Sequence, residues 1–206
     1  ISDGLSKLFK LILLVSASVI VILSKEYLER NNLLNYEYSA LITLSLVGMM
    51  MMVSATNLMS LYLGLELQSL SLYVIAAFRR DNLKSTEAGL KYFVLGALSS
   101  GLLLYGASLV YGFTGTTSFS GISRVIEVEG MSMGLLLGLV FILVAMAFKV
   151  SAVPFHMWTP DVYQGSPTSV TSFFSVVPKA AGIAIFIKFM YLPFRDVLNQ
   201  WQYILV

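Results

Sequence analysis

Long apolar runs separated by short polar segments dominate the sequence. Six runs approach the roughly 20 apolar residues that a helix needs to cross a bilayer. They lie at approximately 8–23, 39–56, 58–78, 88–111, 133–152 and 167–190. Because lipid offers no partner to backbone N–H and C=O groups, such runs predict helices rather than the alternating strands of a barrel. The pattern therefore predicts an all-α fold, a polytopic transmembrane helix bundle of six to seven spans.

Interruptions in the pattern refine this prediction. The polar turn 54–57 separates the second run from the third. Pro154 follows Lys149 closely and cannot continue a regular helix, which predicts a discontinuous helix near Lys149–Pro154. The tail 195–203 contains Trp and Tyr, so it either opens a further span or lies at the membrane interface. The polar segments between runs are short, and we expect a single transmembrane domain over residues 1–206.

The composition agrees with a membrane protein and excludes several other classes. Charged residues make up 12% of the chain, about half the roughly 25% of a soluble domain. The net charge of +2 and the lack of a basic cluster argue against a nucleic-acid partner and leave membrane lipids as the surroundings. With no Cys and one His, the sequence predicts no metal site. Lys and Arg divide equally between alternate loops, so the positive-inside rule gives no orientation.

Glu66 is the only charged residue between Tyr38 and Phe78. A carboxylate at the centre of a span costs about 2.5–3.5 kcal/mol on insertion scales. A polar stripe with spacings i, i+4, i+7 and i+11 surrounds it: Tyr62, Glu66, Ser69 and Tyr73. That stripe must face protein or water. A structural ion pair or an interhelix hydrogen bond would explain Glu66, and so would a role in proton transfer.

Of the thirteen Lys and Arg residues, three are assigned to predicted spans and ten to loops, with Lys188 among the latter. The three are Lys91, Lys149 and Lys179. Lysine can release its proton, whereas arginine stays charged, so a set of three lysines favours proton handling over static anchoring.

Lys179 is the most central of these lysines along its run. Hydroxyl-bearing residues share its helical face: Thr168, Ser172 and Ser175. Pro178 cannot donate to the carbonyl of Phe174, which leaves a polar backbone group at depth. These features favour a relay residue, with a purely structural lysine as the alternative.

The other candidates have equally simple structural interpretations. Lys149 lies near the end of its run, where its amine could extend to the interface. Lys91 follows Glu87 by four residues, in the order that favours an ion pair at the entrance of a span. His156 stands among aromatic residues, as an interfacial packing residue or, because imidazole titrates near neutral pH, as a relay group.

The stretch 147–182 resembles the antiporter-like membrane subunits of respiratory NADH:ubiquinone oxidoreductase (complex I). The shared pattern comprises Lys149, Pro154-Phe155-His156, Trp158, Pro160-Asp161, Gly165-Ser166-Pro167 and Lys179. The form Asp-Val-Tyr-Gln-Gly at 161–165 is similar to subunit 2, called subunit N in bacteria. LELQSLSLYVIAA around Glu66 and STEAGLKYFVLGALSSGLLLYG around Lys91 also agree, so the resemblance extends from about Leu41 to Lys188.

The resemblance implies a proton-translocating subunit that couples quinone reduction to proton pumping. It implies that Glu66 pairs with Lys149 on the broken helix, that Lys179 continues the relay, and that Lys91 is an additional relay lysine. Auxiliary candidates are His156, Tyr62, Ser69 and Ser175. The chain itself would carry no redox chemistry and bind no cofactor, while the complex uses NADH, flavin, iron–sulfur clusters and ubiquinone.

The family fold contains two inverted repeats, and the chain corresponds to the first. The sequence is therefore either an N-terminal-half fragment or the product of a split gene. In the second case we expect a separate chain to carry the missing C-terminal helices, with other membrane-arm subunits of complex I as further partners. The expected location is the mitochondrial inner membrane, with the bacterial plasma membrane as the alternative. Two other functions stay open: a structural scaffold of the membrane arm without its own proton path, and a cation/proton antiporter subunit.

Overall fold

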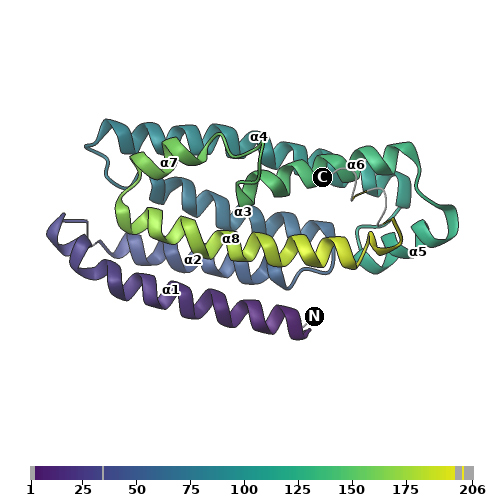
Figure 1. Ribbon diagram of the computed structural model, residues 1–206, viewed down its shortest axis with the longest axis horizontal. Coiled ribbons are helices and arrows are strands. Elements are labelled where there is room, and N and C mark those ends of the chain that lie inside the picture. Colours follow the sequence, from purple (N-terminus) through teal and green to yellow (C-terminus); the bar gives the residue numbers. More distant parts are fainter. Residues whose placement is uncertain (1–2, 34, 198–200, 202–206) are drawn as a thin grey trace.

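A computed structural model describes residues 3–33, 35–197 and 201 (Figure 1). Within these residues, regular structure consists of eight α-helices and one 3-10 helix. They are α1 (Gly4–Arg30), α2 (Tyr36–Val53), α3 (Leu58–Ala76), α4 (Leu83–Thr114), α5 (Phe119–Glu129), α6 (Met133–Val150), α7 (Thr159–Gly165), α8 (Thr168–Tyr191) and η1 (Arg195–Val197). All except α5, α7 and η1 are long and apolar enough to cross a membrane. The all-α transmembrane bundle predicted from the sequence is confirmed.

Polar residues at the breaks between apolar runs cap the helices. Asn57 ends the predicted polar turn and accepts a hydrogen bond from the amide of Ser60 at 2.7 Å, which begins α3. Asn82 accepts from the amide of Lys84 at 2.9 Å at the start of α4. Such caps satisfy amides that have no partner within the helix. They fix where α3 begins and therefore the depth of Glu66 along it.

Two spans are longer than the apolar runs indicate. The run 8–23 lies inside α1, which reaches from Gly4 to Arg30, and the run 88–111 lies inside α4. The polar ends continue the helix because Lys, Glu and Arg are good helix formers. Hydropathy detects the part of a helix that lies in lipid and is silent about its extension into water.

The structure also contains two short helices where we predicted loops. The apolar residues of α5 recur at helical spacing and are buried: Phe119, Ile122 and Ile126. The helix α7 has seven residues and lies after the break that follows α6. Both are too short to appear as membrane-crossing runs. The predicted further span over the tail falls mostly on residues outside the described ranges.

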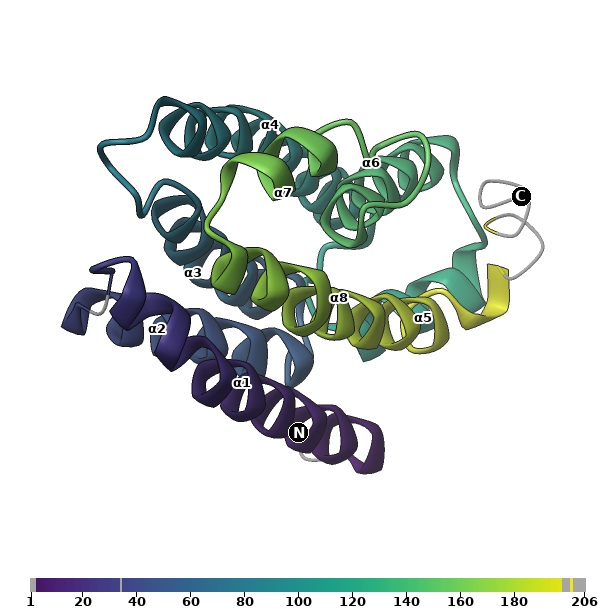
Figure 2. The ribbon, with the colours of Figure 1, turned by 60° about the vertical axis from the view of Figure 1, so that its left-hand side comes forward.

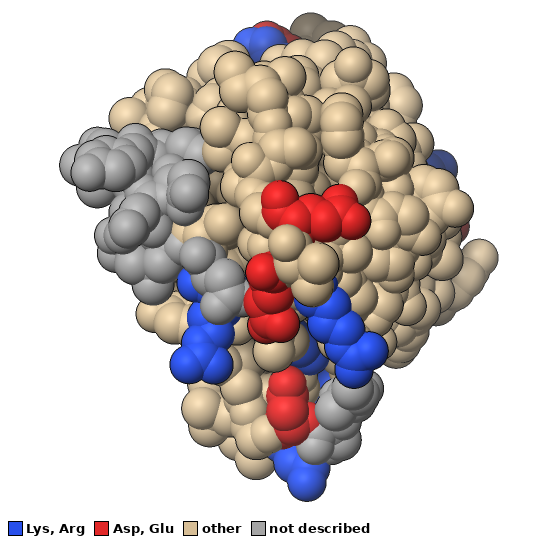
Figure 3. Space-filling model, turned by 90° about the vertical axis from the view of Figure 1, so that its right-hand side faces the viewer, with Lys and Arg blue, Asp and Glu red and all other residues tan. Residues whose placement is uncertain are grey.

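The helices form three layers (Figures 1 and 2). In Figure 2, α1 and α2 lie on one side, α3 and α8 lie in the middle, and α4, α6 and α7 lie on the other side. The end of the bundle where α1 begins and α5 lies carries charged side chains of both signs (Figure 3). This arrangement suits a membrane protein whose charged ends contact water and lipid headgroups.

The middle layer is held against α2 by backbone contact. A methyl group at Gly48 of α2 would lie 2.5 Å from the amide nitrogen of Gln68 and 2.8 Å from the carbonyl oxygen of Gly64 on α3. Small residues allow membrane helices to approach this closely. Gly48 and Gly64 therefore fix α3, the helix that carries Glu66.

The predicted discontinuity after Lys149 is present. The helix α6 ends at Val150, and Ser151 adopts a left-handed conformation with φ of +62°. An irregular segment then leads to α7, and α6 and α7 lie along successive parts of α4 (Figure 1). The indole N–H of Trp158 donates to the carbonyl of Phe148 at 3.0 Å, which ties the irregular segment back to the last turn of α6.

Candidate functional site

Glu66 lies half-buried on α3. Its Oε1 atom is buried and has no hydrogen-bond partner within the described part of the chain. A buried polar atom without a partner costs about 1–3 kcal/mol, and more when it is charged. Glu66 therefore has an open acceptor position inside the protein, which either a proton or a water molecule can fill.

Lys149 extends from the last turn of α6 to the polar stripe of α3. Its Nζ donates to Ser69 Oγ at 2.8 Å and to the hydroxyl of Tyr73 at 3.4 Å. The amine lies 5.7 Å from the centroid of the Tyr73 ring. In the described chain, Glu66 and Lys149 form no ion pair, contrary to the expected direct contact. The side chain of Ser69, one turn along α3 from Glu66, takes that position.

The local backbone explains why the amine points inward. Lys149 lies at the C-terminal end of α6, where the helix dipole favours a cation. Tyr73 has space for its hydroxyl because a side chain at Gly96 of α4 would collide with it. The edge of Tyr73 also packs on Tyr92, with ring centroids 4.8 Å apart. A packed aromatic group thus holds one of the two acceptors that face the lysine.

Lys179 is half-buried on α8, and its Nζ lies 5.3 Å from the centroid of the Tyr163 ring. The hydroxyl of Tyr163 donates to the carbonyl of Phe174 at 3.3 Å. This is the carbonyl that Pro178 leaves without a helical donor. Burial raises the pKa of Tyr163 to about 12, so its hydroxyl stays a neutral donor at physiological pH.

Tyr163 is a residue that the sequence analysis missed. The sequence predicts the free carbonyl of Phe174, and a buried carbonyl of this kind is a usable signal for a donor on another element. Only the three-dimensional structure identifies that donor, because α7 and α8 are separate elements.

Lys91 occupies a different environment, at the surface. Its Nζ lies 2.7 Å from an oxygen of Glu87 and 2.7 Å from an oxygen of Asp161, and its side chain is 42% exposed. The predicted pair with Glu87 is confirmed, and Asp161 of α7 adds a second partner. A polar cavity of about 150 Å³ adjoins these groups. The structure thus places Lys91 in an ion-pair network between α4 and α7, without a contact to the other two lysines.

The auxiliary candidates are dispersed. Ser69 contacts Lys149, as described above. Tyr62 is half-buried on α3, and His156 is exposed in the segment after α6. Ser175 is also exposed, and its hydroxyl donates to the carbonyl of Ser172 in the same helix. The hydroxyl-bearing face of α8 therefore faces outward.

The prediction that Lys188 lies in a loop is wrong, because this residue belongs to α8. It is buried near the end of α8. Its Nζ lies 3.4 Å from an oxygen of Asp3, 3.2 Å from Ser6 Oγ and 3.1 Å from the carbonyl of Val53. Hydrogen bonds from Ser6, together with the charge of Lys188, lower the pKa of Asp3. This cluster joins the ends of α1, α2 and α8.

The chemistry available to the inner groups is proton transfer. An amine such as that of Lys149 can carry a proton, and a carboxylate such as that of Glu66 can accept one. The Ser69 hydroxyl accepts a hydrogen bond from Lys149 and donates one to the carbonyl of Leu65. Among the described residues, no three or more His, Cys, Asp or Glu side chains gather where they could hold a metal ion.

A family model matches more than half of the chain. The model described as NADH:quinone oxidoreductase/Mrp antiporter, TM covers residues 55–206. The chain belongs to this family. The matched residues include Glu66, Lys149 and Lys179.

Curated relatives are similar over the whole chain. A NADH-quinone oxidoreductase subunit N of Rhodobacter capsulatus is 61% identical over 205 residues, which is 100% of this chain and 43% of the relative. The subunit N of Rhodospirillum rubrum is 57% identical over 207 residues and is covered to 42%. The chain thus spans less than half the length of these relatives.

Solved structures of the family have the same fold. A chain in respiratory complex I from Thermus thermophilus is 37% identical, with a TM-score of 0.78, and the match covers 91% of this chain and 40% of the other. A chain of the Mrp complex from Dietzia matches with a TM-score of 0.79 at 21% identity, covering 96% of this chain and 38% of that one. At that identity the likeness concerns the fold alone.

Proposed function

We propose that this chain is part of a proton-translocating membrane-arm subunit of NADH:quinone oxidoreductase. The observation that supports this function best is the contact of Lys149 with Ser69 and Tyr73, on the helix that carries Glu66. The contact puts a proton donor beside a polar stripe inside the membrane-crossing part of the bundle. The relatives named subunit N support the choice of complex.

In the proposed path, Lys149 keeps its proton through the hydrogen bond to Ser69 Oγ. The serine hydroxyl donates to the carbonyl of Leu65 at 2.7 Å, and it can rotate, because a hydroxyl has one proton and two acceptor positions. A proton arriving at Glu66 removes a negative charge close to Lys149 and frees the lysine to pass its proton on. Lys179 is the next acceptor. Each transfer against the membrane potential requires about 2.3 kcal/mol per 100 mV.

The decisive experiment replaces Glu66 by Gln in the assembled complex and measures protons pumped per NADH oxidised. We expect the ratio to fall, because glutamine fills the same space but carries no exchangeable carboxyl proton. The control is Glu127→Gln, which alters an exposed glutamate on α5. An unchanged ratio in Glu66→Gln would falsify the relay.

The alternatives make different predictions. If the chain is a membrane-arm scaffold, Lys179→Met leaves turnover and pumping intact and weakens assembly alone. If it is a cation/proton antiporter subunit, transport depends on sodium. No feature of the described residues favours either alternative over the relay.

The proposal extends to partners and location. The chain matches less than half the length of its relatives. We propose that these residues form the first antiporter-like repeat and pack beside other membrane-arm subunits. Mass spectrometry of the native complex would show whether the C-terminal helices follow in the same polypeptide or belong to a separate one. The relatives named above are bacterial, which favours the plasma membrane. The mitochondrial inner membrane, and the placement of NADH, flavin, iron–sulfur clusters and ubiquinone on other subunits, stay predictions.

A further inference from the structure

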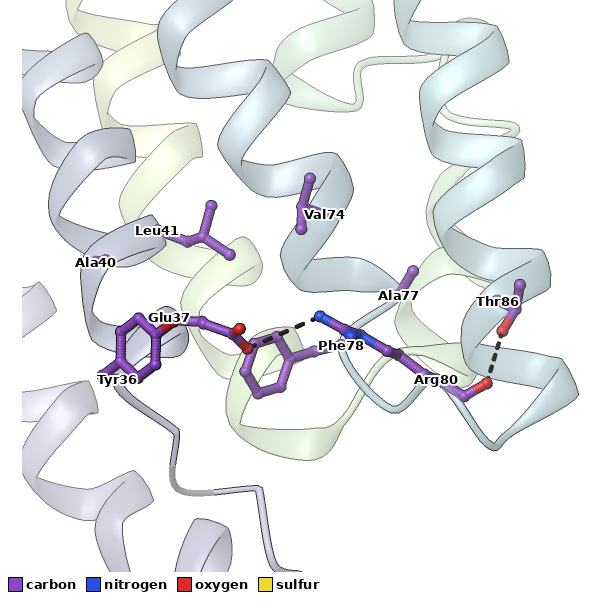
Figure 4. Close-up of a pocket in the computed structure, with 9 residues that line it drawn as sticks. All are labelled: Tyr36, Glu37, Ala40, Leu41, Val74, Ala77, Phe78, Arg80 and Thr86. Carbon is purple, nitrogen blue, oxygen red and sulfur yellow. Dashed lines mark hydrogen bonds and ion pairs between the residues drawn. The ribbon is translucent and has the colours of Figure 1, made fainter.

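A large apolar cavity opens at the end of the bundle where α2 begins, α3 ends and α4 begins (Figure 4). Its volume is about 670 Å³, within the range of about 300–1,000 Å³ that is typical of sites for small molecules. The side chains of Leu41 and Val74 point into it from facing helices, and Arg80 and Glu37 cross its mouth. None of the groups placed in the proton path lines this cavity.

A second, polar cavity of about 540 Å³ adjoins the first. The two cavities share Glu37, Phe78 and Arg80 in their walls. The polar cavity is further lined by asparagines and charged residues: Asn31, Asn32, Asn35, Arg79, Asp81 and Asn82. An apolar compartment and a polar compartment thus meet at Arg80, at the level where the spans end.

The charges in the polar compartment are of both signs. The arginines are Arg79 and Arg80, and the acids are Glu37 and Asp81. Arg79 is fixed by its hydrogen bond to Asn31 Oδ1 at 2.6 Å. The Arg80–Glu37 pair spans 3.8 Å, with side chains 82% and 41% exposed. An exposed pair of this kind is weak, so both groups can turn to a ligand at little cost.

Apolar surface continues from the first cavity toward the middle of the membrane. On α2, exposed residues follow Ala40 at helical spacing: Leu44, Val47 and Met51. On α3, the exposed residues Leu63 and Leu70, with the half-buried Leu67 between them, form a similar row that leads to Val74. Because Ala40 and Val74 line the same cavity, both rows begin at it. Together the two rows form an apolar surface, called the track below, that extends along the spans and could accommodate an acyl chain.

We propose that the two cavities bind one phospholipid with an amine-bearing headgroup, such as phosphatidylethanolamine. The acyl chain enters the apolar cavity and follows the α2 and α3 rows. The phosphate accepts hydrogen bonds from Arg80, and the ammonium group lies beside Glu37. The opposite charges of the protein match the opposite charges of the headgroup, and a lone anion would satisfy only one of them. The exposed Tyr36 at the cavity mouth has the amphipathic ring that favours the headgroup level.

The test uses the purified full chain in vesicles of phosphatidylcholine that contain a small fraction of phosphatidylethanolamine with a photoreactive group on its acyl chain. After illumination, peptide mass spectrometry locates the adducts. We expect labelling concentrated at 36–41 and 74–80, reduced at least five-fold in Ala40→Trp, which fills the cavity, and reduced similarly in Arg80→Ala. The matched controls change residues outside the cavities: Leu98→Trp on α4 and Arg124→Ala on α5, which keep full labelling.

Probe chemistry keeps the test independent of any variant. A photoreactive diacylglycerol with the same acyl chain lacks the phosphate and the amine, and we expect it to label wild-type protein at least five-fold less. Excess inorganic phosphate should not compete, which separates a lipid headgroup from a free phosphate. Equal labelling by both lipids, or competition by phosphate, overturns the proposal. A photoreactive residue at position 40 that forms adducts with protein instead of lipid in native membranes also overturns it, because a partner helix would then fill the track.

Discussion

The hydroxyl of Tyr163 donates to the carbonyl oxygen of Phe174 at 3.3 Å, and this carbonyl has lost its helical donor to Pro178. A buried carbonyl without a partner costs about 1–3 kcal/mol. The tyrosine therefore compensates for a proline one helix away, and at the same time its ring faces the amine of Lys179. A single side chain joins the stability of α8 to the environment of its lysine.

The two roles of Tyr163 can be separated by substitution. Tyr163→Phe keeps the ring and should cost about 1–3 kcal/mol of stability, because the Phe174 carbonyl loses its donor. In a Pro178→Ala background the new amide supplies the donor, so the same substitution should cost much less. Thermal unfolding of the four proteins of this cycle gives the coupling. Equal costs in both backgrounds would show that the hydroxyl does not compensate for the proline.

The ring of Tyr163 should matter for Lys179. A cation over an aromatic face gains about 0.5–2 kcal/mol. We therefore expect Tyr163→Leu to lower proton pumping per NADH oxidised, while Tyr163→Phe retains most of it. Tyr191→Leu, which removes an exposed ring at the end of the same helix α8, serves as the control. Similar pumping in the Phe and Leu variants would exclude a role for the ring.

Ser69 should be important because it contacts Lys149 directly. Ser69→Ala removes the acceptor at 2.8 Å and leaves only the longer bond to Tyr73. Hydrogen bonds to charged groups contribute about 1.5–3 kcal/mol, and the thermal unfolding midpoint should fall accordingly. Ser71→Ala is the matched control, since within the described part of the chain the Ser71 hydroxyl bonds to the carbonyl of Leu67 in its own helix and to no other group. If both variants lose the same stability, the Lys149 contact contributes nothing.

Acid should weaken the cluster at the start of α1. The pKa of Asp3 is lowered from its ordinary value of 3.8, first by the Ser6 hydrogen bond and further by Lys188. A lowered pKa means that the unfolded chain binds the proton more readily, so Asp3 stabilises the fold fully above 3.8 and loses this contribution as pH falls through the lowered value. Asp3→Asn should reduce stability at neutral pH and flatten its decline in acid. A slope in Asp3→Asn identical to that of wild type would contradict the assignment.

The contact between α2 and α3 predicts a contrast among glycines. Gly48→Ala and Gly64→Ala should each lower the free energy of unfolding by about 1–3 kcal/mol, the typical cost of overpacking. The new methyl group meets backbone atoms, which cannot rotate away as a side chain can. Gly101→Ala on α4 has open space around it and should be neutral or stabilising by up to about 1 kcal/mol. Unfolding in denaturant distinguishes the two cases. A neutral Gly48→Ala would mean that the helices are not in backbone contact.

The spans and the break could be predicted because lipid imposes simple rules on sequence. Apolar length marks a span, and Pro154 marks an interruption. The extension of α1 and the helix α5 could not be found by these rules. Yet Phe119, Ile122 and Ile126 are apolar residues at helical spacing, and this spacing was a usable signal for α5.

The partners within the site were harder to predict. Sequence spacing places Glu66 and Ser69 on one face of α3, but it does not say which of them a lysine from another helix reaches. Lys188 shows the same limit, because its partner Ser6 is 182 positions away. Such pairs depend on how the helices pack, and a single sequence does not contain that information in readable form.

The glycine contact between α2 and α3 has a consequence for motion. Two helices in backbone contact cannot slide past each other without first separating, so we expect α3 to keep its position relative to α2. The end of α6, which carries Lys149, faces α3 and is followed by an irregular segment. That segment has no continuous ladder of helical hydrogen bonds. We therefore expect α6 and the segment after it to move more readily than α3, so that a change in the reach of Lys149 occurs against a Glu66 that keeps its place beside α2.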